Sequence, residues 1–443
     1  MKMVILLKRK IYEKLLEWKN NNINKPLMVI GARQVGKTYI IQKFCNKEFK
    51  EYIYINLLEY QDIIEIFSRK ISIVDKIELL KIIIKDKQNI DFDPEKMVIF
   101  FDEIQESEEL ISCLKYFNEA KENYKIICAG SLLGVKLNRM KSSFPVGKVK
   151  MLELNPMDFE EYIVEIMGEN IVTILKNCYD KNEPLVEPMH DKLLSLYRNY
   201  LCIGGMPESV SNYININKEI IKFDKSIIED IIKGYTKDMK KYVQDNTETV
   251  RIENIYNSIP SQIGNKSGKF QYAKINKDAR SKNYETALNW LLSSKLVDRV
   301  CLLNSVQIPP KAYENTDYFK LFLSDVGILT SLLKINFADI ILDKEFIFKG
   351  EIAENYVEQQ LRNNVEQLYY WKSENTAEVD FVIYNNDGLI PIEVKAGDSV
   401  KSKSLYVYNK RFKPKYSIRV SAKNFGFANN IKSIPLYAAF LIN

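Results

Sequence analysis

The sequence predicts an α/β protein of several domains, and three patterns carry this prediction. An apolar strand over residues 26–30 leads into a glycine-bearing loop and then into a helical pattern. A second apolar strand, over 97–101, ends in two acids. Further along, residues 350–422 show helix and strand periodicities in the order αβββαβ. Such alternation is typical of the α/β class.

The length and composition predict a globular, multi-domain protein. At 443 residues the chain is too long for one core, and two to four domains are expected. The six cysteines are scattered without CxxC pairs, which indicates buried, reduced thiols of a cytoplasmic protein. The single histidine, His190, is expected on a surface or helix flank and cannot build a zinc site alone. The apolar run at 3–7 is too short for a signal peptide, and no stretch predicts a membrane span.

The loop after the first strand reads Gly31-Ala-Arg-Gln-Val-Gly36-Lys37-Thr38, which is the Walker A pattern G-x-x-x-x-G-K-[ST] between a strand and a helix. Glycines let backbone N–H groups surround phosphates, and the helix start adds partial positive charge. Lys37 is expected to reach the β- and γ-phosphates of ATP, and the Thr38 hydroxyl to bind Mg²⁺. The residues expected around the nucleotide are Gly31, Ala32, Arg33, Gln34, Val35, Gly36, Lys37, Thr38 and Tyr39.

The second apolar strand ends in Asp102 and Glu103, as the other half of a P-loop site requires. Asp102 is expected to join the Mg²⁺ shell and Glu103 to polarise the attacking water. The alternative is that the two acids only cap the helix that follows. The Walker A loop upstream favours the catalytic interpretation.

Several stretches together resemble the prokaryotic AAA-type ATPases that carry a C-terminal domain of unknown function, nearly end to end. These stretches are GARQVGKT, VIFFDEIQ, CAGSLLG, FPVGKVKMLELNPMDFEEY and YLCIGGMPESV. The resemblance implies ATP and Mg²⁺ as cofactors, and it makes Ser131, after the strand at 125–129, the candidate sensor of the γ-phosphate. The family commonly has Arg after the glycine that precedes the LEL-P segment, where this chain has Lys148. Because Lys cannot imitate the planar guanidinium, an arginine finger and an obligate ring are in doubt, although Arg139 could substitute.

The triplet Gly205-Met206-Pro207 resembles the G-x-P signature that borders the adenine in related switch ATPases. A turn that connects two helices is the other interpretation.

The middle of the chain is expected to be helical over 186–243 and then to form a winged helix. Three short helices, 252–264, 275–281 and 283–296, precede strands at 297–303 and 311–314. The third helix would present Asn283, Tyr284 and Thr286 to DNA, after the basic residues Lys274, Lys277, Arg280 and Lys282. Winged helices also serve as protein–protein modules, so that alternative stays open.

The αβββαβ segment, with Asp380 and the pair Glu393-x-Lys395, resembles the PD-(D/E)xK nuclease fold. A turn of even length at 385–388 would put Asp380 on the same face as Glu393 and Lys395. The two carboxylates could then share Mg²⁺, with Lys395 positioning or deprotonating its water, and with Glu354, or Glu351 one turn away, completing the shell. No proline precedes Asp380, and Glu378 has no assigned role. A nuclease-like fold kept for DNA binding alone is the alternative.

Charge supports a nucleic-acid partner, because residues 401–443 hold nine Lys or Arg and no acid within a chain of net charge +6. The predicted division is a P-loop ATPase domain (1–165), a helical lid (166–243), a winged-helix-like domain (244–340) and a nuclease-like domain (344–443). We therefore expect an ATP-hydrolysing protein that acts on DNA, with an Mg²⁺-dependent endonuclease domain. The alternatives are a nucleotide-controlled DNA- or protein-binding switch without nuclease activity, and an ATPase that remodels proteins. An oligomer is compatible with the sequence.

Overall fold

The computed structural model describes residues 7–21, 25–119, 122, 124–140, 144–241, 245–264, 268–374, 377–398 and 402–443. The chain forms two compact units. The N-terminal unit comprises residues 8–155 together with 293–295, and the C-terminal unit comprises Leu7, 156–292 and 296–443. The chain therefore passes between the units at Leu7–Lys8, Asn155–Pro156, Leu292–Ser293 and Lys295–Leu296.

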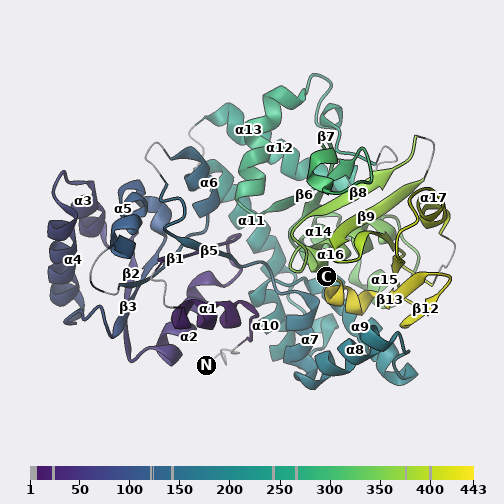
Figure 1. The fold of residues 1–443 in the computed structure, drawn as a ribbon, viewed down its shortest axis with the longest axis horizontal. Helices are drawn as coiled ribbons and strands as arrows, with labels where there is room; N and C mark the ends of the chain where they lie inside the picture. Colours follow the sequence, from purple (N-terminus) through teal and green to yellow (C-terminus); the bar gives the residue numbers. More distant parts are fainter. Residues whose placement is uncertain are drawn as a thin grey trace. The chain divides into compact units, whose positions relative to one another are not determined.

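The N-terminal unit contains a five-stranded parallel sheet in the order β2-β3-β4-β1-β5 (Figure 1). Its strands are β1 (Leu27–Ile30), β2 (Glu51–Asn56), β3 (Met97–Asp102), β4 (Lys125–Ala129) and β5 (Lys150–Glu153). Its helices are α1 (Ile11–Asn20), α2 (Lys37–Glu48), α3 (Gln61–Ser68), α4 (Ile73–Gln88), the 3₁₀ turn η1 (Ile104–Glu106), α5 (Glu108–Glu119) and α6 (Leu133–Arg139).

Helices cover this sheet on both faces, which is why its central strands are apolar throughout. Every residue of β3 is buried. One core joins Ile99 and Phe101 of β3 to Leu80 of α4 and Leu114 of α5, while α2 packs against β2, β3 and β4. The strands predicted at 26–30, 97–101 and 125–129 are confirmed. Because the strands are parallel, the carboxyl ends of β1, β3 and β4 lie at one edge of the sheet.

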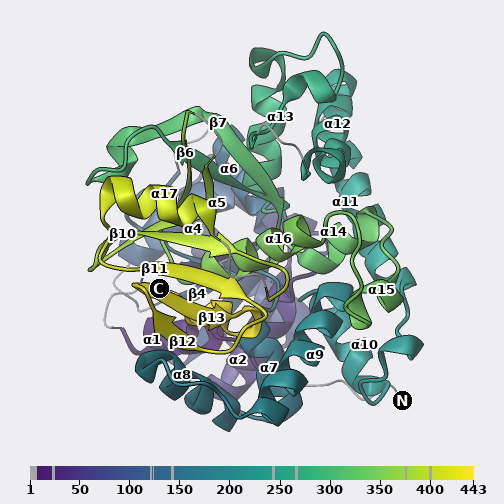
Figure 2. The same cartoon turned by 90° about the vertical axis from the view of Figure 1, so that its right-hand side faces the viewer.

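The C-terminal unit is built on a mixed sheet in the order β12-β13-β11-β10-β9-β8-β6-β7, in which Figure 2 shows β10, β11 and β13 side by side. Its strands are β6 (Val297–Leu303), β7 (Glu314–Leu323), β8 (Leu368–Lys372), β9 (Glu378–Asn385), β10 (Gly388–Val394), β11 (Ser417–Ser421), β12 (Gly426–Ala428) and β13 (Ile431–Pro435). Its helices are α7 (Phe159–Met167), α8 (Asn170–Lys181), α9 (Glu187–Ile203), α10 (Pro207–Asn215), α11 (Ser226–Lys241), α12 (Asn246–Gln262), α13 (Ser281–Ser293), α14 (Val326–Leu332), α15 (Phe337–Ile341), α16 (Lys349–Leu361) and α17 (Lys403–Phe412), with the 3₁₀ turns η2 (Ile220–Lys222), η3 (Tyr272–Lys274), η4 (Pro310–Tyr313) and η5 (Leu436–Leu441).

The order αβββαβ predicted for the last hundred residues is confirmed, as α16, β8, β9, β10, α17 and β11. Asn385 pairs with Gly388, so the turn between β9 and β10 has two residues and an even length. Gly388 has a φ of 100°, a conformation that favours glycine. Helix α17 packs on β9 and β10, with Leu405 and Tyr408 in the core beside Trp371.

The region predicted as a winged helix differs from that plan at three points. Residues 275–281 do not form a helix, because the Asn276 side chain accepts a hydrogen bond from the backbone N–H of Asp278 and closes a turn. The strand predicted at 311–314 is the 3₁₀ turn η4, which begins at Pro310. Finally, β6 pairs not only with β7 but also, in parallel, with β8. The hairpin therefore belongs to the large sheet and is not a free-standing wing.

His190, expected on a surface or helix flank, is instead buried, with Nδ1 2.7 Å from the hydroxyl oxygen of Tyr437. All six cysteines are free thiols, and four of them are buried: Cys45, Cys128, Cys202 and Cys301. Among the helices in the described part of the chain, none is both long and apolar enough to cross a membrane.

Candidate functional site

The Walker A loop connects β1 to α2 in a shape that glycine makes accessible. Gly36 has a φ of 89° and Gln34 a φ of 66°, both in the left-handed region. A Cβ added at Gly31 would lie 2.1 Å from the carbonyl oxygen of Leu154. The loop therefore requires glycine at position 31, because a larger residue would collide with the backbone that follows β5.

Lys37 is buried at the start of α2, with 6% of its surface exposed. Its Nζ donates hydrogen bonds to the carbonyl oxygens of Gly31, at 2.9 Å, and Ala32, at 2.7 Å. The ammonium group thus lies inside the Walker A loop, beside two neutral carbonyl oxygens. The N–H of Ile40 donates to the carbonyl oxygen of Gly36, at 3.0 Å, and the N–H groups of the first turn of a helix have no acceptor within the helix itself. This arrangement fits a bound phosphate chain.

Asp102 joins the end of β3 to the Walker A loop. Its Oδ2 accepts hydrogen bonds from the hydroxyls of Thr38, at 2.7 Å, and Tyr54, at 3.2 Å, while Oδ1 accepts from the N–H of Glu103, at 3.1 Å. Burial raises the pKa of Asp102, and the hydrogen bond from Thr38 opposes that rise. A hydroxyl and a carboxylate in contact are hard oxygen ligands of the kind that Mg²⁺ prefers, so these residues fit the ion.

Glu103 and Ser131 lie at the same edge of the sheet as Asp102. Glu103 adopts a left-handed conformation, with a φ of 54°, and accepts a short hydrogen bond from the side-chain amide of Gln105. A Cβ on Gly130 would lie 2.1 Å from Oε1 of Gln105, so this glutamine packs between Glu103 and the segment before Ser131. The sequence prediction did not include Gln105 in the site, although it stands two residues after Glu103 in the motif VIFFDEIQ.

No arginine finger is assigned, either at Arg139 or at Lys148, which stands where the family commonly has Arg. Nζ of Lys148 lies 2.9 Å from a carboxylate oxygen of Glu119 on α5, so this cation has a partner within the unit. Arg139 is the last residue of α6, and its side chain lies outside the described residues.

The Gly204-Gly205 segment joins α9 to α10 in the C-terminal unit. The N–H of Gly205 donates to Oδ2 of Asp325, at 2.6 Å, and its carbonyl oxygen accepts from the N–H of Met157, at 2.7 Å. Gly204 has a φ of 71°, and a Cβ there would lie 2.0 Å from Oδ1 of Asp325. These contacts favour the interpretation of Gly205-Met206-Pro207 as a buried turn that connects two helices.

The acids of the β9–β10 hairpin share a face of the sheet, as predicted. Phe381 pairs with Ile392, so Glu393 is the next residue to face Asp380. Oδ2 of Asp380 accepts a hydrogen bond from the N–H of Val394, at 2.7 Å, and Glu393 pairs with Lys395, at 2.7 Å. Glu393 is 4% exposed, and burial raises the pKa of Asp380 well above its usual range.

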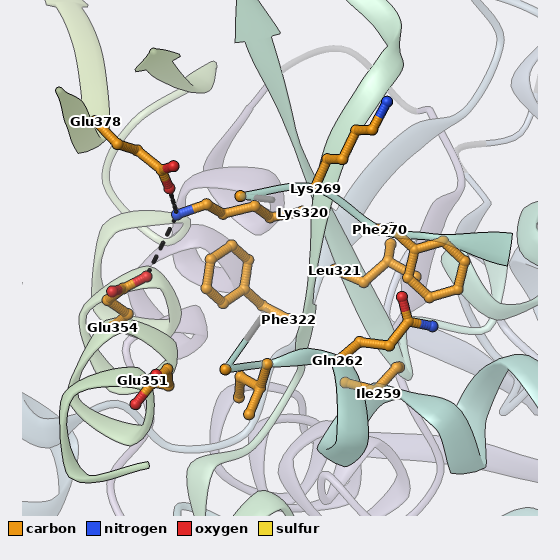
Figure 3. A pocket seen from close by; sticks show the side chains of 13 residues that line it. Ile259, Gln262, Lys269, Phe270, Lys320, Leu321, Phe322, Glu351, Glu354 and Glu378 are labelled. Carbon is orange, nitrogen blue, oxygen red and sulfur yellow. Dashed lines mark hydrogen bonds and ion pairs between the residues drawn. The ribbon is translucent and has the colours of Figure 1, made fainter. Parts of the chain in front are cut away.

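A lysine from β7, Lys320, lies between Glu354 of α16 and Glu378 of β9 (Figure 3). Nζ of Lys320 lies 2.6 Å from Oε1 of Glu378 and 3.5 Å from Oε2 of Glu354. Glu378 also pairs with Lys372, at 3.4 Å. Burial alone would lower the pKa of Lys320, but the carboxylates of Glu354 and Glu378 outweigh it and raise that pKa. Sequence reasoning missed Lys320 because nothing in β7 marks it as part of an acidic site.

Lys320, Glu351, Glu354 and Glu378 line a cavity of about 280 Å³. Within the described residues, no group of three or more His, Cys, Asp or Glu side chains is arranged to hold a metal ion. The predicted metal ligands Asp380, Glu393 and Glu354 thus lie in the same region, with a lysine ammonium beside Glu354.

Family comparisons divide the chain into three parts. Residues 23–163 match the family described as AAA domain. The N-terminal unit is a P-loop ATPase domain of the AAA type. Residues 194–339 and 349–439 match two families described as domains of unknown function, DUF8612 and DUF4143.

Three similar proteins come from archaea. An uncharacterised protein of Methanocaldococcus jannaschii is 27% identical over 403 residues, which cover 88% of this chain and 79% of that protein. Among solved structures, a Walker-type ATPase of Pyrococcus abyssi is 16% identical, with a TM-score of 0.45 over 74% of this chain and 96% of the other. The ORC2 protein of Aeropyrum pernix is 13% identical, with a TM-score of 0.39 over 76% of this chain and 95% of the other.

Proposed function

We propose that this protein is a nucleotide-controlled switch: it binds and hydrolyses ATP at the Walker A loop and thereby controls its hold on DNA. The observation that carries the ATP site is the hydrogen bond between Thr38 and Asp102, 2.7 Å long and spanning 64 residues of sequence. It brings the two halves of a P-loop site together at one edge of the sheet. The lysine among the carboxylates of the C-terminal unit supports a switch that does not cut.

Each residue of the ATP site has a definite role in this proposal. Bound Mg²⁺ would neutralise charge that develops on the phosphates during hydrolysis. Lys37 exchanges its carbonyl partners for phosphate oxygens, and Thr38 and Asp102 provide the oxygens that hold the ion. Glu103 accepts the proton of the attacking water, and Ser131 contacts the terminal phosphate.

Two substitutions separate binding from hydrolysis. Lys37→Ala is expected to lower both nucleotide affinity and turnover, whereas Glu103→Gln is expected to keep affinity and lower turnover by about 100-fold or more. Fluorescent-nucleotide titration measures the first quantity and phosphate release the second. Lys96→Ala is a matched control, because this exposed lysine of the same unit pairs with Asp93 three residues before it. Full turnover by Glu103→Gln would overturn the assignment of the base.

A groove beside α13 supports DNA as the partner. It has a volume of about 780 Å³ and is lined by four basic side chains, Lys269, Arg280, Lys282 and Arg299, against two acids, Glu285 and Asp317. Its wall is aromatic, since the rings of Phe270 and Phe319 stack with centroids 5.7 Å apart. Basic side chains on a rigid wall suit a phosphate backbone.

Only part of the predicted DNA surface takes part in this groove. Arg280 and Lys282 line it, and Asn283 and Thr286 are exposed on α13. Tyr284, expected to face DNA, is instead buried and receives a hydrogen bond from Asn276. The basic residues after 400 do not all serve a common surface either: Lys415 pairs with Asp387 at 2.5 Å, and Nζ of Lys432 lies 3.4 Å from the ring centroid of Tyr179.

Titration of short duplex DNA tests this part of the proposal. Affinity should fall with salt, and the double variant Arg280→Ala/Lys282→Ala should lower both affinity and the salt slope, by about one unit per lost phosphate contact. The control is Lys222→Ala/Lys233→Ala, because each of these lysines pairs with an acid three residues earlier in the chain. ATP and ADP should give different affinities. Salt-independent or absent binding would favour a protein-remodelling ATPase.

Metal-dependent nuclease activity is a second candidate, favoured by one observation: Glu393 faces Asp380 across the hairpin, as two ligands of a shared ion would. Lys320 opposes it, because an ammonium already neutralises Glu378 and Glu354. We expect plasmid DNA to stay intact with Mg²⁺ or Mn²⁺ and ATP. If plasmid DNA is nicked and Asp380→Ala abolishes the nicking, the nuclease function would be favoured instead.

A further inference from the structure

Arg9 lies two residues before α1 and connects two segments that are distant in sequence. It is 7% exposed. Its Nη1 donates to the carbonyl oxygen of Val35, at 2.8 Å, and its Nη2 to that of Asn155, at 2.5 Å. Val35 belongs to the Walker A loop, and Asn155 is the last residue before the chain enters the C-terminal unit. One guanidinium therefore binds both the phosphate loop and the connection that leaves the unit.

Two further contacts bind the same connection to the phosphate loop. The N–H of Leu154 donates to the carbonyl oxygen of Ile30, the last residue of β1, at 2.8 Å. The carbonyl oxygen of Leu154 lies so close to Gly31 that no side chain fits between them. A change in the position of the loop must therefore change residues 154–155 as well, because the contacts are close and buried.

On the other side of the boundary, the connection is held just as firmly within the C-terminal unit. The N–H of Met157 donates to Gly205, and the Met157 carbonyl oxygen accepts a short hydrogen bond from the hydroxyl of Tyr200. Gly205 in turn donates to Asp325, which also caps α14 through the N–H of Ile328, at 3.1 Å.

The same network continues into α16. The side-chain amide of Gln359 donates to the hydroxyl of Tyr200, at 2.8 Å, and its oxygen accepts from the N–H of Val326, at 2.9 Å. The neighbouring Gln360 accepts from the N–H of Phe159, at 2.7 Å. Gln359 and Gln360 are 0% exposed. Buried polar groups that are fully satisfied tolerate few alternative arrangements.

We propose that Arg9 is a positioning residue that couples the nucleotide site to the C-terminal unit through Asn155, Met157 and Gly205. The proposal rests on nucleotide binding at the Walker A loop, as proposed above. A guanidinium offers donors in a fixed plane, so it can bind both carbonyls only while loop and connection keep one relative position. Nucleotide that repositions Val35 changes the bond to Asn155, and the hydrogen bonds of Met157 and Gly205 change with it. Such coupling is reciprocal, so the state of the C-terminal unit also alters nucleotide affinity.

Hydrogen exchange of the full-length protein tests the coupling, with ADP or a non-hydrolysable ATP analogue at a concentration that saturates each variant. In the wild type, saturation should change exchange at the amides of Met157 and Gly205 and in α16 by about fivefold or more, the lower end of usual allosteric couplings. Arg9→Lys keeps the charge but not the fork, so the response in the C-terminal unit should vanish while exchange in the Walker A loop still responds. Arg69→Lys, an exposed arginine of the same unit, is the control.

The outcomes separate this inference from the proposed function. Absence of nucleotide binding by the wild type would overturn the ATP site itself. Binding with a response confined to the N-terminal unit would overturn the coupling alone, as would an undiminished response in Arg9→Lys. If Arg9→Lys does not fold, Asp325→Asn interrupts the same network beyond the boundary without touching the nucleotide site. That variant should still bind nucleotide at the Walker A loop and lose the response in α16, and a retained response would overturn the route.

Discussion

Two lysines with little exposed surface have partners of different charge. Lys37 donates hydrogen bonds to the neutral carbonyl oxygens of Gly31 and Ala32, which add no negative charge beside the ammonium. Lys320 lies between the carboxylates of Glu354 and Glu378. Taking an ammonium out of water is costly, and carboxylates offset that cost more fully than carbonyl oxygens do.

Lys320→Met should destabilise the C-terminal unit by about 1.5–3 kcal/mol, because the variant removes the ammonium from the half-buried Glu354 and the nearer of two lysines from Glu378. Urea unfolding at pH 7 measures the loss. Lys372→Met removes a lysine whose side chain is 30% exposed and 3.4 Å from the same Glu378, and should cost about 1 kcal/mol or less. Equal losses for both variants would contradict the central position of Lys320.

Glu358 of α16 predicts a pH dependence of stability. Burial, aided by the nearby Asp298 and opposed by Arg362, raises its pKa from 4.5 to about 8. A raised pKa means that the folded state holds this proton more tightly than the unfolded state does. The contribution of this carboxyl group to the stability of the fold is therefore complete below pH 4.5 and is lost as pH rises through about 8. Glu358→Gln should therefore gain stability relative to the wild type between pH 5 and 8, by at most about 1.4 kcal/mol per pH unit. Chemical unfolding across that pH range measures the difference in stability between the variant and the wild type. A difference that does not change with pH would mean that the carboxyl group is ionised throughout.

Among the elements, strands and the Walker A loop could be predicted from sequence because their signals are local. Periodicity located β3, and the order of α16 through β11 followed from alternation of patterns. The prediction of a helix at 275–281 was wrong because the side chain of Asn276 closes a turn, which hydrophobic periodicity does not reveal. The pairing of β6 with β8 could not be foreseen, since it joins strands separated by most of a domain.

The site followed the same division between local and distant signals. Thr38 and Asp102 were predicted to bind the same Mg²⁺ because each belongs to a short sequence pattern, the Walker A motif and an apolar strand that ends in acids. Arg9 and Lys320 were not, because each acts on residues far away in sequence: Asn155 lies 146 positions from Arg9, and Glu354 lies 34 positions from Lys320.

The connection between α9 and α10 predicts a steric effect that can be isolated. Gly204→Ala would put a methyl group 2.0 Å from Oδ1 of Asp325 at a φ of 71°, and should cost about 4 kcal/mol or more. Gly168, at the end of α7, has a similar φ of 85° but no atom within 4 Å of an added Cβ. Gly168→Ala should therefore show only the backbone penalty, about 1–2 kcal/mol. Thermal unfolding of both variants compares them, and similar losses would exclude a clash with Asp325.

At the scale of the whole molecule, two compact units with separate cores predict two unfolding transitions in calorimetry. Mg²⁺ and ADP at about 100 times the dissociation constant should add about 2.7 kcal/mol to the stability of the N-terminal unit. Lys37→Ala should abolish this gain. Nucleotide that shifts neither transition would contradict an ATP site in the folded chain.

The discontinuous make-up of the C-terminal unit affects how the chain can fold during its synthesis. The N-terminal sheet, β1 to β5, is complete in residues 27–153 and can close early. Strand β6 pairs in parallel with β8, which is synthesised later. Tyr437 of η5 contacts His190 of α9, a helix that is synthesised long before η5. The sheet of the N-terminal unit can thus form on the ribosome before the strands of the C-terminal unit have been synthesised. During that period the helices of residues 156–292 have no sheet to pack against, and chaperones would bind mostly there.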